Sequence, residues 1–129
     1  GIVVLNIKEL IEKAVKEKER FVTVRIEQMD GEIKLRIPFS KELEELREKH
    51  KGKYEDMMYD LIYNCCEEPR LNSDELLNHF QSKDIPYKVV EKVFGQGISE
   101  SIANIILDEK SKENSVKILQ NKADEIKNP

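Results

Sequence analysis

The chain contains no tryptophan, only two cysteines and two histidines, and five glycines among its 129 residues. The cysteines are the adjacent pair Cys65-Cys66, which cannot provide the disulfide framework of a small secreted protein. No stretch approaches the roughly 20 apolar residues that span a bilayer, and the start lacks the pattern of a signal peptide. These absences argue against a disulfide scaffold, and they predict a cytoplasmic protein with no membrane partner.

Charged residues are abundant instead, at 37% of the chain against roughly 25% in a typical globular protein. The net charge of -4 is concentrated in residues 39–106, which carry nine basic and fourteen acidic side chains. Binding to phosphate groups needs a basic face, so we predict no nucleic-acid partner. The high charge is typical of amphipathic helices whose polar faces meet solvent.

The N-terminal region predicts a helix followed by a β-hairpin. Asn6 can cap a helix that ends in the charged residues 16–20, with apolar side chains at three- and four-residue spacing: Ile7, Leu10, Ile11, Ala14 and Val15. Before it, residues 2–5 favour β structure, and they could add a third strand to the sheet or fray.

The hairpin is indicated by apolar residues that alternate on both sides of Asp30-Gly31. A two-residue type I′ turn at this dipeptide would pair Ile26 with Leu35 and Val24 with Ile37. Two strands alone are marginal in water, so we expect the first helix to pack on their apolar face.

A series of helices is predicted after Pro38. Ser40 precedes a charged helix over residues 41–50, and the strongest helical pattern runs from Tyr54 to Cys66 before Pro69. Shorter helices follow at Ser73, Asp84 and Ser99, and Gly95 and Gly97 end the second of them. Near the end of the chain, four apolar residues at three- and four-residue steps predict a weak amphipathic helix, which we call the terminal seam: Val116, Leu119, Ala123 and Ile126.

These patterns predict an α+β protein that is mostly α. Residues 1–38 would form the N-terminal helix packed on a hairpin of two or three strands. Residues 39–107 would form a helical subdomain of four to five helices, and residues 108–129 a charged segment that is helical or partly disordered.

No constellation of residues points to catalysis. His50 and His79 lie in charged helical contexts without a second ligand nearby, so we predict surface residues and no metal site. Cys65 and Cys66 are interpreted as small buried hydrophobic residues. The carboxylates alternate with basic residues, as solvating charge does. We therefore expect a protein that is not an enzyme and has no cofactor.

The middle of the chain resembles a known family. The resemblance covers residues 33–107, and it rests on Tyr54, Leu61-Ile62, Glu68-Pro69-Arg70-Leu71, Asp74-Glu75-Leu76, Val89-Val90, Val93-Phe94, Gly97 and Ile102, preceded by Ile37-Pro38 and the acidic stretch that begins at Ser40. In this order and spacing the chain resembles the XkdN-like tail assembly chaperones of long-tailed phages, defective prophages and phage-tail-like bacteriocins. It departs from the family at Gln96-Gly97-Ile98, where Pro-Gly-Glu is usual, so a role that rests on that glutamate does not carry over.

The resemblance implies a chaperone in the cytoplasm of a bacterial host. Such a protein binds the tape measure protein while the tail tube polymerises around it, and it is absent from the finished tail. Related genes often produce a longer protein by ribosomal frameshifting, so a frameshifted form of the chain itself is a further expected partner. The exposed hairpin edge and residues 2–5 also leave homo-oligomer formation open.

We expect a partner to contact the outer arc of the central helix, at Tyr59 and Tyr63, together with Phe80 and Tyr87. The terminal seam is the second candidate, with Val116, Leu119, Ala123 and Ile126. Two alternatives stay open: the four aromatic residues could pack between layers of their own domain, and the chain could be a small regulatory or adaptor protein that acts by protein binding.

Overall fold

The computed structural model describes residues 3–121 and has a mixed α+β fold, as the sequence predicts. Its elements, in chain order, are α1 (Ile7–Glu12), β1 (Phe21–Ile26), the 3-10 turn η1 (Glu27–Met29), β2 (Gly31–Arg36), α2 (Ser40–Lys49), α3 (Tyr54–Cys65), β3 (Cys66–Glu68), α4 (Asp74–His79), the 3-10 turn η2 (Pro86–Lys88) and α5 (Val89–Lys112).

The three strands form one antiparallel sheet in the order β1-β2-β3. The hairpin exists, but its predicted register is wrong, because Ile26 pairs with Gly31 and Val24 with Ile33. The turn is not of type I′: residues 27–29 form a 3-10 turn, and only Asp30, with φ 47° and ψ 48°, has the left-handed conformation. The shift is an even number of residues, so the same side chains still face the core.

The third strand comes from an unexpected segment. The sequence indicated residues 2–5 as a possible third strand. Residues 3–5 are not in a strand, and residue 2 lies outside the described residues. Instead, α3 ends at Cys65 and the chain extends at once into β3, where Cys66 pairs with Leu35 of β2. Helix α3 is thereby tied directly to the sheet.

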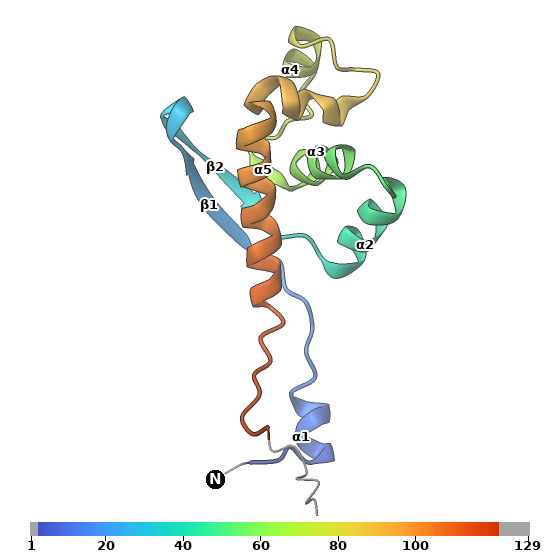
Figure 1. Ribbon diagram of the computed structural model, residues 1–129, viewed down its shortest axis with the longest axis vertical. Helices are drawn as coiled ribbons and strands as arrows, with labels where there is room; N and C mark the ends of the chain where they lie inside the picture. Colours follow the sequence, from blue (N-terminus) through green and yellow to red (C-terminus); the bar gives the residue numbers. More distant parts are fainter. Residues whose placement is uncertain (1–2, 122–129) are drawn as a thin grey trace, which may run out of the picture.

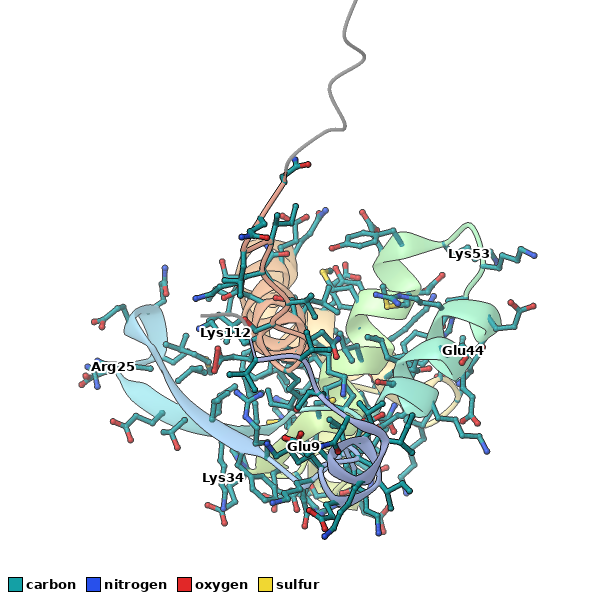
Figure 2. All side chains as sticks on the ribbon, turned by 90° about the horizontal axis from the view of Figure 1, so that it is seen from below. Glu9, Arg25, Lys34, Glu44, Lys53 and Lys112 are labelled. Atoms are coloured by element: carbon teal, nitrogen blue, oxygen red, sulfur yellow. The ribbon has the colours of Figure 1, made fainter. Side chains whose placement is uncertain are left out.

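Helix α5 is the central element, and it covers the face of the hairpin. It runs between the hairpin on one side and α2 and α3 on the other (Figure 1). The view from below looks nearly along α5 at Lys112, with Arg25 of the hairpin on one side and Glu44 and Lys53 on the opposite side (Figure 2). Hairpin residues such as Ile33 and Leu35 share one buried cluster with Ile102 and Ile106 of α5.

Two features of α5 differ from the prediction. Gly95 interrupts the helix with φ 76° and ψ 168°, but helical backbone resumes directly after it, so Gly97 and Ser99 lie within the helix. The helix also continues to Lys112, beyond the expected end at residue 107. Ser99 does not cap the second half from outside, because its hydroxyl donates a hydrogen bond of 2.6 Å to the carbonyl oxygen of Gly95.

Helix α1 does not pack on the hairpin, contrary to expectation. It has no buried residue, and it extends away from the body at the end opposite the hairpin tip (Figure 1). It is also shorter than predicted, since residues 14–20 are not helical. The longer apolar stripe of α5 occupies the sheet face that the sequence assigned to α1, which leaves α1 without a surface to cover.

Candidate partner-binding surfaces

Residues 3–16, which we call the N-terminal arm, form an apolar surface outside the core. Asn6 begins α1 with a capping box: its side chain accepts a hydrogen bond from the N–H of Glu9, whose carboxylate accepts one from the N–H of Asn6. The large apolar side chains of the arm are exposed over a range from 48% at Leu5 to 93% at Val15. Several exposed large apolar side chains within one short segment are typical of a protein-binding site.

Two ion-pair sites, which we call the anchor, hold the arm to the body. The Glu17 carboxylate accepts a hydrogen bond of 2.8 Å from the backbone N–H of Ser40 at the start of α2, and it lies 3.0 Å from Nζ of Lys110. The bond from Ser40, followed by that from Lys110, lowers the pKa of Glu17. Arg20 donates to the carboxylate of Glu109 at 3.0 Å and to that of Glu113 at 3.4 Å. The anchor therefore joins the arm to the far end of α5.

The ammonium group of Lys110 is buried within this anchor. Burial alone would lower its pKa, but hydrogen bonds from Lys110 to Glu113 and Glu17 outweigh that effect, and the pKa is raised. Lys110 thus remains charged between two carboxylates, and its ion pair with Glu17 fixes the position at which the arm leaves the body.

The terminal seam lies near the end of the described residues. Val116 and Leu119 are exposed, and residues 115–121 are not helical. Ala123 and Ile126 fall outside the part of the chain that the structure describes. Val116 and Leu119 are therefore accessible to a partner, but the predicted helix is not present over residues 115–121.

The aromatic candidates are only partly accessible. Tyr59 is 3% exposed, so the outer arc of α3 is covered at this position by the protein's own structure. Tyr63, Phe80 and Tyr87 are half-buried against the same core, and the Tyr87 hydroxyl donates a 3.3 Å hydrogen bond to Asp56. Because α3 packs against α5 and η2, packing within the domain accounts for Tyr59.

A groove that the sequence does not predict lies at the opposite end of the molecule from the arm. Its volume is about 520 Å³, and it lies among the hairpin tip, α4 and the first part of α5. Apolar side chains dominate its lining: Ile26, Met29, Ile33, Leu71, Leu76, Val93 and Phe94. The signal in the sequence was Met29, an apolar side chain at a turn, which is half-exposed in the structure.

His50 is not a surface residue as predicted, since it is only 8% exposed. Its Nε2 lies 2.7 Å from Oδ2 of Asp60, which is buried on α3. Lys49 donates to the same oxygen at 2.9 Å, and the Asn64 amide donates to Oδ1 at 2.8 Å. The ring of Tyr87 meets that of His50 edge-on, with 5.2 Å between the ring centroids.

This polar cluster satisfies a buried carboxylate, as burial of a charge requires. The partners of Asp60 come from both α2 and α3, so the cluster fastens these helices together. His79, in contrast, is exposed, as expected.

The two cysteines are buried and free, as predicted. Burial raises the pKa of the Cys65 thiol to about 12 and that of Cys66 to about 11. Both thiols are therefore protonated near neutral pH, which makes them poor nucleophiles.

No family model matches the chain, and neither a curated protein nor a solved structure matches it. Among residues 3–121, no three or more His, Cys, Asp or Glu side chains are grouped so that they could hold a metal ion. None of the helices in this described part has the length and apolar character needed to cross a membrane.

Proposed function

We propose that this chain is a non-enzymatic tail assembly chaperone that binds the tape measure protein during polymerisation of the tail tube. The observation that carries the proposal is the N-terminal arm, an apolar surface attached to a highly charged body. The resemblance of residues 33–107 to the XkdN-like chaperones supplies the identity of the partner. The bacterial cytoplasm is the corresponding location.

The arm has the pattern of a helix that docks against another helix. Ile7, Leu10, Ile11 and Ala14 follow the i, i+3, i+4, i+7 spacing of anchor residues in helix recognition. A tape measure protein, in the family that the chain resembles, is long, apolar and helical. A chaperone for such a chain needs an exposed apolar stripe on a soluble body, and the charges of residues 39–106 favour solubility.

Other surfaces enlarge the proposed binding region. The segment after α5, which contains the exposed Val116 and Leu119, leaves the body at the same end as the arm (Figure 1). Tyr63, Phe80 and Tyr87 are half-buried and remain available for secondary contacts. Tyr59 does not belong to the proposed binding region, because its side chain lies in the core.

Co-purification with a co-expressed tape measure protein tests the proposal. We expect the wild-type pair to co-purify and Ile11→Asp to reduce the recovered partner at least tenfold, because a charge in the apolar stripe would have to be desolvated. Leu119→Asp tests the second surface in the same assay. Tyr54→Asp is the matched control, since it replaces another exposed apolar side chain at the start of α3, away from both surfaces.

The absence of any association between the wild-type proteins would contradict the chaperone function. Equal recovery of the partner with wild type and Ile11→Asp would exclude the arm as the binding surface. A chain that instead bound a different cellular protein through the arm would be a regulatory adaptor.

A further inference from the structure

The arm and the groove are two apolar surfaces of one chain that do not meet. We propose that the groove binds the N-terminal arm of a second copy of this chain, so that the arm is covered when no other partner is present. This inference concerns the purified chain alone, and it is independent of the proposed function.

The shapes and side chains of the two surfaces correspond. An amphipathic helix that enters an apolar groove places its anchors at positions i, i+3, i+4 and i+7, and the arm supplies Ile7, Leu10, Ile11 and Ala14 at this spacing. The groove volume of about 520 Å³ is comparable to that of pockets that hold a small ligand, roughly 300–1,000 Å³, and the groove is lined mainly by apolar side chains. Its walls come from three elements, so an inserted helix would contact the hairpin tip, α4 and α5 together.

The charges of the two surfaces are also complementary. Glu32 and Glu75 line the groove, and neither belongs to an ion pair with another described residue. The third charged group, Arg70, already pairs with Glu67 at 2.6 Å. The arm carries three lysines, at positions 8, 13 and 16, against two glutamates, at 9 and 12. The groove charges that are not in ion pairs, those of Glu32 and Glu75, are therefore negative, and the net charge of the arm is positive.

The arm cannot fill the groove of its own chain. From Glu17 in the anchor to the end of α1 at Glu12, the chain spans at most about 17 Å even when fully extended. The helix between Lys110 in the anchor and Phe94 in the groove is about 24 Å long. Helix α1 also lies at the opposite end of the molecule from α4 and the hairpin tip, which line the groove (Figure 1). A second copy must therefore provide the arm.

The absence of a docking partner in the single chain accounts for an α1 that is shorter than its sequence pattern. Apolar spacing continues through Ala14 and Val15, yet the helix ends at Glu12. A short helix without packing is marginally stable in water, and contact with a groove would stabilise a further turn. Self-association is therefore expected to increase the helix content of the chain.

Complementation between two defective variants tests the proposal. Ile11→Asp damages the arm, and Met29→Asp damages the rim of the groove. Both side chains are half or more exposed, so the variants should fold normally. In analytical ultracentrifugation we expect the wild type to self-associate and each variant alone to show at least a tenfold higher Kd. An equimolar mixture should form a 1:1 complex, because one intact arm meets one intact groove.

Tyr54→Asp serves as the matched control and should associate like the wild type. A wild type that stays monomeric at high concentration would overturn the proposal, as would Met29→Asp associating like wild type or a mixture that forms no complex. If either Asp variant fails to fold, a charge reversal replaces it: Lys8→Glu on the arm or Glu75→Lys in the groove. Each reversal alone should weaken self-association, and a mixture of the two should restore binding. No restoration by the reversed pair would also refute the docking of the arm in the groove.

Discussion

Removal of the Asp60 carboxylate tests the polar cluster that joins α2 and α3. The perturbation is Asp60→Ala, with Asp60→Asn as a conservative companion. In the wild type, this carboxylate is 3% exposed and binds His50, Lys49 and Asn64 at distances of 2.7 to 2.9 Å. Alanine leaves His50 and Lys49 without this acceptor, while the Asn64 amide keeps its 2.7 Å hydrogen bond to the backbone carbonyl oxygen of residue 60. Asparagine keeps one side-chain oxygen in place.

The expected loss follows from the burial of each donor. The buried His50 ring loses its only side-chain hydrogen-bond partner among the described residues, and an unsatisfied buried group costs about 1–3 kcal/mol. Lys49 is largely exposed and can turn to water, so it adds less than the roughly 3–5 kcal/mol of a fully buried broken pair. We expect Asp60→Ala to lower the free energy of unfolding by about 2–4 kcal/mol, and Asp60→Asn by about half as much.

Urea denaturation followed by circular dichroism measures this free energy. Glu44→Ala, an exposed change on α2, is the control and should stay within about 0.5 kcal/mol of wild type. The double variant that also removes His50 should lose less than the sum of the two single losses, because the two groups are in contact. A loss below about 0.5 kcal/mol for Asp60→Ala would refute the role assigned to the cluster.

Three further predictions concern thiols, a surface carboxylate and a backbone conformation. With their pKa values raised to about 12 and 11, Cys65 and Cys66 should react with a thiol reagent at pH 8 only as the protein unfolds, and equal labelling rates in buffer and urea would contradict this. The Arg36 guanidinium donates two hydrogen bonds to the Glu42 carboxylate and lowers its pKa below 4.5. The stabilisation from this ion pair is therefore present above pH 4.5 and is lost as the pH falls through the lowered pKa. Glu42→Gln should therefore cost about 1–2 kcal/mol at pH 7 but less at pH 3, as urea titrations at the two pH values would show, and an equal cost at both would contradict the assignment. Gly95→Ala should destabilise by about 1–3 kcal/mol because of the positive φ, whereas Gly97→Ala, in open helical backbone, should stabilise by roughly 0.5–1 kcal/mol; thermal melts that shift in the same direction would contradict this pair.

Local signals in the sequence predicted the elements well. Asn6 caps α1 and Ser73 caps α4, as their side chains and positions indicate. The alternating strands and the helix after Pro38 also lie where the periodicity places them. These features depend on residues a few positions apart, which is the range over which spacing and capping act.

The geometry of the hairpin turn, and features that depend on distant residues, could not be predicted. The Asp30-Gly31 dipeptide suggested a turn with two positive φ angles, but only Asp30 has one, and the loop is longer by two residues. The burial of His50 depends on Asp60 of the next helix. The free surface of α1 and the groove around Met29 both follow from the position of α5, which the sequence does not show.

The anchor has a consequence for anything attached to this chain. Glu17 and Arg20 hold the segment before the hairpin against Lys110 and Glu109, so the chain enters and leaves the body at one pole (Figure 1). A label placed on the segment 115–121, which follows α5, would therefore lie at the same pole as the arm. A label inserted at the hairpin turn near Gln28 would instead lie beside the groove. Two labels, one at each pole, could therefore probe the arm and the groove separately in the same molecule.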